Sequence, residues 1–370
     1  MKRYLCLLLA AMLLTIPICG KGGPPEVQAQ CAVLYDGLTG DCLFARNETL
    51  RRGMASTTKI MTGLVALEQY DPEMTVEIQP EWCAAEGSSM GLKPGERLTV
   101  SDLLYGLLLE SGNDAADALA GLDAGGTEGF VAGMNARAEA LGLTDTHFCN
   151  PSGLDAPEHY STALDLARLA AAALENDAFA RIVSTRSITL AGREMTNHNR
   201  LLGEINACGI KTGYTMACGR CLVSAKREQG RLLICVTLND RQDWADHKAL
   251  LEWGFAQYQT VPLVGAGDCG SVPLFSGERS SCRLYCAENF SFALRQQEQG
   301  RLRLTLTGPR LCYGPVRAGD RYGSLQVRLD GSLLWETPVY YSENIAPAEA
   351  PCGLRRLWDT LCGRFGRREH

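Results

Sequence analysis

Apolar side chains recur every three or four residues through the middle of the chain, which is the spacing of an amphipathic helix. The pattern is clearest over residues 56–69, where Ile60, Leu64 and Leu67 share one face. The same spacing predicts further helices, several of them rich in alanine, over residues 100–110, 114–122, 130–141, 162–174 and 246–255.

Short runs of β-forming residues flank this helical middle. Residues 32–35 and 42–45 predict two strands joined by a turn-rich connection, and residues 221–225 and 232–238 predict buried strands. Strands at both ends of a helical stretch indicate an α+β domain over residues 30–260. Its sheet takes strands from both ends of the sequence, with helices on its faces.

A different pattern begins after residues 262–270, where glycine and small residues accumulate. Leucines alternate with polar residues over 302–306, and Leu325, Val327 and Leu329 alternate with Gln326 and Arg328. A period of two is typical of half-buried strands. We therefore predict a small all-β domain over residues 271–342.

The N-terminus has the pattern of an export signal. Lys2 and Arg3 precede a nearly unbroken apolar run over residues 5–18, which is short for a membrane span. We predict a signal peptide over residues 1–29, with the cleavage position left open, and an exported, extracytoplasmic protein. The alternatives are a lipidated Cys19 and a buried N-terminal helix.

The C-terminal end resembles neither domain. A linker over 343–352, rich in proline and alanine, precedes an amphipathic helix predicted over 353–370, with Trp358 and Phe365 among its apolar residues and four arginines around the rest. Such a helix can lie in a membrane interface, so we expect it to hold the protein at the membrane periphery. Docking on the protein's own surface is the alternative.

Composition narrows the range of partners. The chain of 370 residues is 46% apolar and 21% charged, and its net charge of −6 lacks the basic surface that nucleic-acid binding needs. Its 16 cysteines are many for an exported protein, but their spacing does not determine whether or how they pair. The histidines form no recognisable metal motif, so we expect no metal and no cofactor.

Three short motifs carry candidate chemistry. Ser56 and Lys59 lie three residues apart at the start of a predicted helix, so they share a face. A serine hydroxyl needs a nearby base to act as a nucleophile, and a buried lysine beside a second cation loses its proton more easily. Lys211 in Lys211-Thr212-Gly213 could be that second cation, and Ser111-Gly112-Asn113 lies between two predicted helices.

Each motif alone is common, but the three in this order are typical of β-lactamases and penicillin-binding proteins. From about residue 31 to 255 the chain resembles the low-molecular-mass penicillin-binding proteins of the D-Ala-D-Ala carboxypeptidase type. The matching segments read ASTTKIMT at 55–62, GSSMGLKPG at 87–95, LYGL at 104–107, SGNDAA at 111–116, NPSGLD at 150–155, TNHN at 196–199 and GIKTGYT at 209–215.

The resemblance implies a β-lactamase/transpeptidase-like domain, an antiparallel sheet with a helical cluster, followed by a β-rich stalk and a membrane anchor. It implies removal of the terminal D-alanine from peptidoglycan stem peptides through an acyl-enzyme, and reaction with β-lactam antibiotics. The implied roles are Ser56 as nucleophile, Lys59 as its base, Ser111 as proton relay and Asn113 as substrate ligand. Carboxylate binding falls to Lys211, Thr212 and Thr215, and the oxyanion hole to the backbone N–H groups of Ser56 and Tyr214, beside Gly213.

Two departures from the family pattern stand out. Cys218 is an extra residue and creates a Cys-x-x-Cys with Cys221, which we interpret as packing rather than a metal or redox site. His198 lies near the position where some relatives use an arginine for the substrate carboxylate; Arg200 and Arg241 are the alternatives.

Other functions share the same motifs. A D,D-endopeptidase would use the same chemistry on cross-links, and a non-catalytic wall-binding protein would keep the pocket without turnover. A β-lactamase would need a deacylating base such as the glutamate of class A enzymes, and no matching segment lies between Ser111 and Lys211.

Overall fold

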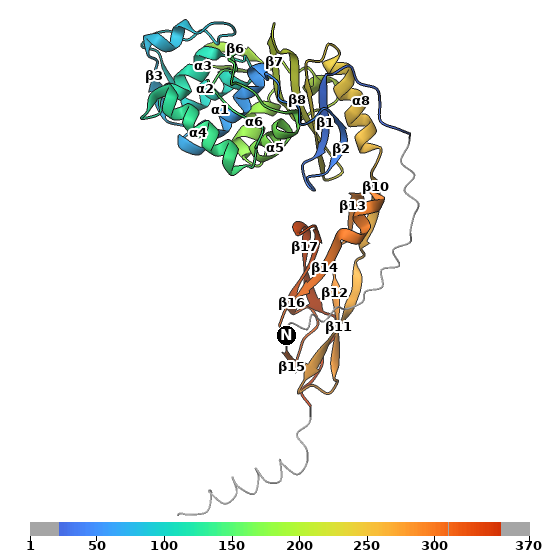
Figure 1. Cartoon of the computed structure of the whole chain (residues 1–370). Helices are drawn as coiled ribbons and strands as arrows, with labels where there is room; N and C mark the ends of the chain where they lie inside the picture. The colour runs from blue at the N-terminus through green and yellow to red at the C-terminus, as the bar shows by residue number, and fades with distance from the viewer. Residues whose placement is uncertain (1–21, 310, 349–370) are drawn as a thin grey trace, which may run out of the picture. The chain divides into compact units, whose positions relative to one another are not determined.

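A computed structural model describes residues 22–309 and 311–348. The chain divides into two compact units, one ending at Tyr258 and the other beginning at Gln259 (Figure 1). The predicted signal peptide lies mostly, and the amphipathic tail wholly, outside the described residues. The predicted domain limits at 260 and 271 and the linker over 343–352 remain predictions.

The first unit is built on a five-stranded antiparallel sheet that takes strands from both ends of its sequence, as the pattern predicts. The sheet order is β2-β1-β9-β8-β7, so β7 forms one edge. The strands are β1 (Cys31–Asp36), β2 (Cys42–Arg46), β7 (Ile210–Thr215), β8 (Gly219–Glu228) and β9 (Arg231–Leu238).

Alternate residues of the central strands enter two different cores. Val33 and Val236 belong to a core that includes the helical cluster, whereas Leu34 and Cys235 pack with Leu250 of α8. Because side chains alternate across a strand, a central strand covered on both faces buries every residue, as β9 does. Figure 1 accordingly shows α8 on one side of the sheet and the helical cluster on the other.

The helices of this unit agree with the predicted positions to within a few residues, except that short α6 and α7 were not predicted. They are α1 (Lys59–Gln69), α2 (Val100–Leu108), α3 (Asn113–Gly121), α4 (Gly126–Ala140), α5 (Ala163–Ala173), α6 (Asp177–Ser184), α7 (Leu201–Glu204) and α8 (Asp243–Phe255). Two short hairpins complete it: β3 (Thr75–Glu77) with β4 (Arg97–Thr99), and β5 (Ser187–Leu190) with β6 (Arg193–Thr196).

Helix α1 is buried along its first two turns. Every residue from Lys59 to Ala66 is buried, and α1 contacts α2, α3, α4, α5 and α6. A helix surrounded in this way has no solvated face. A charged residue at its start is therefore removed from water.

The second unit is all β, as predicted. A six-stranded sheet has the order β14-β16-β17-β12-β11-β15, and β10 pairs separately with β13. The strands are β10 (Gln259–Val264), β11 (Gly267–Phe275), β12 (Ser281–Cys286), β13 (Phe290–Leu294), β14 (Leu302–Thr307), β15 (Cys312–Tyr313), β16 (Arg321–Leu329) and β17 (Ser332–Tyr341).

The two alternating segments behave differently. In β16, Leu325, Val327 and Leu329 are buried, whereas Leu304 of the edge strand β14 is exposed. The stretch over 262–270, rich in glycine and small residues, carries the end of β10 and the start of β11. Register shifts in both strands interrupt the period of two that would have revealed them.

Within residues 22–309 and 311–348, no helix has the length and apolar character needed to cross a membrane.

Candidate active site

Ser56 and Lys59 lie where a tight turn passes into α1. Residues Ala55–Thr58 form a 3-10 turn and Lys59 is the first residue of α1, so Ser56 is not in the α-helix that the periodicity predicted. Lys59 Nζ lies 3.1 Å from Ser56 Oγ. The spacing of three residues thus brings the hydroxyl and the amine together, as predicted. The backbone between them is a 3-10 turn rather than the predicted α-helix.

The other contacts of Lys59 determine which way a proton can move. Lys59 Nζ lies 2.6 Å from Asn113 Oδ1 and 2.5 Å from the Ser152 carbonyl, and both oxygens can only accept. Asn113 Nδ2 donates to the Glu86 carbonyl, which fixes the amide orientation. A neutral amine has two N–H groups for these acceptors, and its lone pair is then left for the Ser56 hydroxyl.

Electrostatics favour that neutral amine. Burial, followed by the positive charge of Lys211, holds the pKa of Lys59 well below its ordinary value. Lys211 is buried on β7, and burial lowers its own pKa to about 7 although Glu110 opposes the shift. Lys211 thus acts on Lys59 in the direction that the sequence argument requires.

Strand β7 packs directly against the Ser56 turn. A Cβ atom placed on Gly213 would lie 3.0 Å from the backbone nitrogen of Ser56, so glycine allows this approach. Tyr214 is 64% exposed and Thr212 is partly exposed on the other side of the strand. Because β7 is an edge strand, its outer N–H and C=O groups can pair with an extended peptide.

Ser111 and Asn113 flank the end of α2 and the start of α3. Ser111 is buried and has a φ of +61°. The loop over 87–92 is held beside them by Asp114, whose carboxylate accepts from the backbone N–H groups of Met90, Gly91 and Leu92. Asp114 thus links the segments SGNDAA and GSSMGLKPG.

His198 lies near Lys211 and Glu110. Its Nε2 is 3.6 Å from Glu110 Oε2, its side chain is 48% exposed, and burial together with the charge of Lys211 lowers its pKa. Arg200 instead pairs with Glu204 and stacks on Trp244. His198, rather than Arg200, is therefore the side chain placed beside the lysine of β7.

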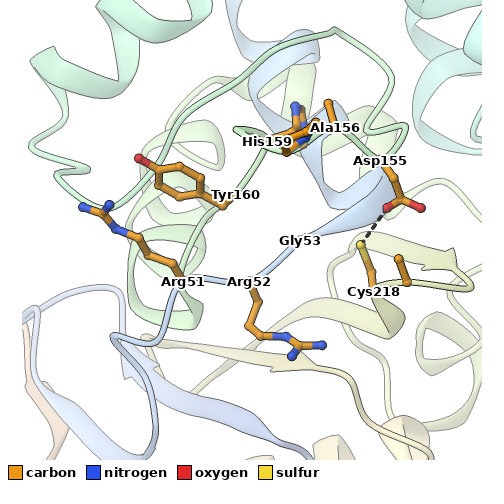
Figure 2. A pocket seen from close by; sticks show the side chains of 10 residues that line it. Arg51, Arg52, Gly53, Asp155, Ala156, His159, Tyr160 and Cys218 are labelled. Atoms are coloured by element: carbon orange, nitrogen blue, oxygen red, sulfur yellow. Dashed lines mark hydrogen bonds between the residues drawn. The ribbon is translucent and has the colours of Figure 1, made fainter.

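Thr215 has a local role that the sequence did not indicate. Its hydroxyl donates to Asp155 Oδ1 at 2.9 Å and accepts from the Cys218 N–H at 3.0 Å, and the Cys218 thiol also donates to Asp155 at 3.1 Å (Figure 2). The hydroxyl predicted to bind the substrate carboxylate thus joins two loops of the protein. The cysteines of the described residues are free thiols, and both Cys218 and Cys221 are buried.

Sequence reasoning missed several contributors to the site. Ser152 supplies a carbonyl, Glu110 pairs with His198, and Asp155 holds Thr215. Ser152 and Asp155 fall within a segment quoted for the resemblance, but no local pattern reveals contacts across 93 or 60 residues. Among the described residues, no group of acidic, histidine or cysteine side chains could hold a metal ion.

Gly153 provides a test of how tightly the loop over 150–155 supports the Ser56 turn. Its φ is +89°, and a Cβ atom would lie 2.0 Å from the Ala55 carbonyl oxygen. We expect Gly153→Ala to lower the free energy of unfolding by at least about 3 kcal/mol and to slow acylation of Ser56, because backbone must move. Urea unfolding and penicillin acylation rates would measure both effects.

Gly142 is the matched control. It also has a positive φ, +68°, but no atom lies within 4 Å of its Cβ position. Gly142→Ala should cost only about 1 kcal/mol, the cost of the backbone conformation itself. Equal effects of the two substitutions would show that the close approach to Ala55 is unimportant.

Solved structures resemble this arrangement over most of the chain. Penicillin-binding protein 5 from Haemophilus influenzae is 28% identical with a TM-score of 0.63, covering 88% of this chain and 100% of that one. Penicillin-binding protein 6B from Escherichia coli is 32% identical with a TM-score of 0.63, covering 86% of this chain and 96% of that one. Fold and site together define a low-molecular-mass penicillin-binding protein.

The family is more specific than this class. Residues 20–242 match the family described as D-alanyl-D-alanine carboxypeptidase, and residues 258–347 match the C-terminal domain of penicillin-binding protein 5. D-alanyl-D-alanine carboxypeptidase DacD of Escherichia coli K12 is 36% identical over 324 residues, covering 82% of this chain and 83% of that protein. The chain belongs to the D-alanyl-D-alanine carboxypeptidase family.

Proposed function

We propose that this protein is a serine-type D-Ala-D-Ala carboxypeptidase that removes the terminal D-alanine from peptidoglycan stem peptides. The observation that carries the proposal is the hydroxyl of Ser56 at 3.1 Å from a buried lysine amine whose pKa is strongly lowered. Family membership supports the substrate class. The same serine would be acylated by β-lactam antibiotics.

In the proposed acylation, Lys59 takes the proton of Ser56 while Oγ attacks the carbonyl of the penultimate D-alanine. The backbone N–H groups of Ser56 and Tyr214 stabilise the oxyanion, an interaction worth about 100-fold to 1000-fold per donor. Ser111 relays a proton to the leaving D-alanine amine. Water then hydrolyses the ester and frees Ser56.

Substrate positioning falls to the residues around β7. Asn113 holds both the substrate amide and the Lys59 amine. The terminal carboxylate is attracted by Lys211, Thr212 and His198. Gly213 allows the backbone of β7 to lie close to Ser56. Thr215 helps to bind the same carboxylate, and its hydrogen bond to Asp155 fixes the end of the strand.

Mass spectrometry of purified muropeptides after incubation with the enzyme tests the proposal. We expect pentapeptide stems to lose one alanine, and a sample inhibited beforehand with penicillin to leave them intact. Cleavage of cross-linked dimers without alanine loss would favour the D,D-endopeptidase. A chain that binds muropeptides without any product would favour the wall-binding protein.

The pH dependence of acylation tests the pairing of the two lysines. The charge of Lys211 lowers the pKa of Lys59, so removing that charge in Lys211→Met should raise it. Because the neutral amine is the active form, the acidic limb of the acylation profile should move to higher pH. Lys211→Arg keeps the charge and should leave that limb near its wild-type position; a shift equal to that of Lys211→Met would contradict this pairing.

We also propose that the protein acts outside the cytoplasm, and that residues 353–370 hold it at the periphery of the membrane. The positive start and apolar run of the N-terminus, and the basic amphipathic pattern of the tail, support this location. Co-sedimentation with anionic vesicles, with and without these residues, would test it.

A further inference from the structure

Three exposed apolar side chains gather at one edge of the second unit. Phe275 ends β11 and is 49% exposed, Tyr313 ends β15 and is 61% exposed, and Leu311, just before β15, is 55% exposed. The ring centroids of Phe275 and Tyr313 lie 6.0 Å apart. We call these three residues the aromatic patch. Single exposed apolar residues are normal, whereas a group of them marks a contact surface.

Strand pairing keeps the two rings out of the core. The edge strand β15 pairs in parallel with β11, with Leu274 opposite Cys312 and Phe275 opposite Tyr313. Leu274 and Cys312 are buried together in the core of the second unit. Because side chains alternate across a strand, Phe275 and Tyr313 must point to the opposite face. The register of the sheet itself therefore exposes both rings.

The aromatic patch lies where the described chain runs toward the predicted amphipathic tail. The Ala348 N–H donates to the Ser276 carbonyl at 2.8 Å, and Ser276 directly follows Phe275. Figure 1 shows β15 near the end of the second unit at which the described chain runs out. Residue 353 follows Ala348 by five residues, so their Cα atoms are at most about 19 Å apart. A surface that holds residues 353–370 is therefore close to the patch.

Charge does not distinguish this end of the second unit. Arg279 pairs with Glu343 at 2.6 Å, and exposed Glu278 lies next to Arg279 in the chain. Arg317 is exposed as well, so basic and acidic side chains are mixed. An attraction of this end to another surface must therefore come from its apolar side chains.

Two other occupants fit the aromatic patch poorly. The predicted helix over 353–370 would be about 27 Å long, whereas the patch spans two neighbouring strands about 5 Å apart. Three half-exposed side chains present roughly 300 Å². Each partner in a stable complex buries about 800 Å², so a second copy of the chain is not matched either. A lipid surface has no fixed shape and accepts a small patch.

We propose that the aromatic patch inserts into the interface of the membrane to which residues 353–370 bind. The inference rests on the proposed membrane location. Phenylalanine and tyrosine suit this contact because one part of each patch is apolar and the tyrosine hydroxyl can stay in water. The contact would hold this end of the folded second unit against the lipid surface, in addition to the tail.

The test measures co-sedimentation of the full chain with vesicles of phosphatidylcholine and phosphatidylglycerol. The double variant Phe275→Ser, Tyr313→Ser should bind at least about 10-fold more weakly than wild type, because even partial burial of two aromatic rings has that effect. The matched control is Leu304→Ser, Leu333→Ser, on β14 and β17, where the two leucines are 41% and 47% exposed. It should bind like wild type.

Two further readouts identify the contact as apolar. The ratio of wild-type to double-variant binding should persist at high salt, because salt screens charges and does not weaken apolar contacts. Phe275→Trp, Tyr313→Trp should bind like wild type, because tryptophan also suits the interface. Thermal unfolding verifies the fold of each variant. Tyr313→Ser alone changes only the more exposed ring and should weaken binding about 3-fold if the double variant does not fold.

The outcomes separate the inference from the proposals beneath it. Wild-type binding by the serine double variant would overturn the inference and leave the membrane role of residues 353–370 intact. Tighter binding would show that the patch holds the tail, and a dimer without vesicles that the double variant abolishes would assign the patch to a second copy; either result overturns the inference. No binding of wild type to vesicles would overturn the proposed location as well. D-alanine release from soluble peptides should be unchanged in every variant.

Discussion

Replacing Ser56 by alanine should abolish labelling by a fluorescent penicillin and lower D-alanine release by at least about 10⁴-fold. The reason is that the acyl-enzyme needs the Ser56 oxygen, and the described contacts place no other hydroxyl against Lys59 Nζ. Loss of a nucleophile removes the covalent pathway and leaves only the catalysis that binding and oxyanion stabilisation provide.

The substitution should leave the fold intact. Lys59 keeps Asn113 and Ser152 as partners when the hydroxyl is gone. A matched control is Ser184→Ala, on the exposed side of α6, which should label like wild type. Thermal unfolding of both variants would exclude a folding defect, and covalent penicillin on the Ser56→Ala protein would disprove the assignment of the nucleophile.

Replacing Lys59, the proposed base, should have the second large effect on the rate of acylation. Lys59→Met should lower the penicillin acylation rate by about 10³-fold, within the range by which a positioned base accelerates a reaction. Lys59→Arg should be similarly inactive although it preserves a cation, because a guanidinium does not give up its proton in proteins. The measurement is the second-order rate of acylation at pH 7.

The two variants also separate charge from proton transfer. If the role of Lys59 were only to supply positive charge, the arginine variant would keep much of the activity and the methionine variant would not. Lys59→Met leaves Asn113 Oδ1 and the Ser152 carbonyl without the amine, at a cost of roughly 1–3 kcal/mol for each oxygen. Folding must therefore be verified by thermal unfolding. A folded methionine variant with acylation within 10-fold of wild type would exclude Lys59 as the base.

The motifs predicted which distant segments meet, whereas the local patterns predicted single helices and strands. Ser56, Lys59, Asn113 and Lys211 come together as expected, although their segments are up to 155 residues apart along the chain. The strands β10 and β11 were not predicted, because register shifts in both break the alternation. The substrate role of Thr215 comes from the resemblance alone and stays a prediction; the hydrogen bond of its hydroxyl to Asp155 is a contact that no local pattern indicated.

What the sequence determined by itself was local. The spacing of Ser56 and Lys59, the apolar face of α1 and the alternation in β16 follow from the geometry of one helix or one strand. Tertiary structure decided the rest: the burial that lowers the pKa of Lys59, the Ser152 carbonyl that orients it, and the strand pairing that brings Phe275 beside Tyr313. Desolvation and contacts across the chain depend on which elements pack together, and periodicity within one element does not contain that information.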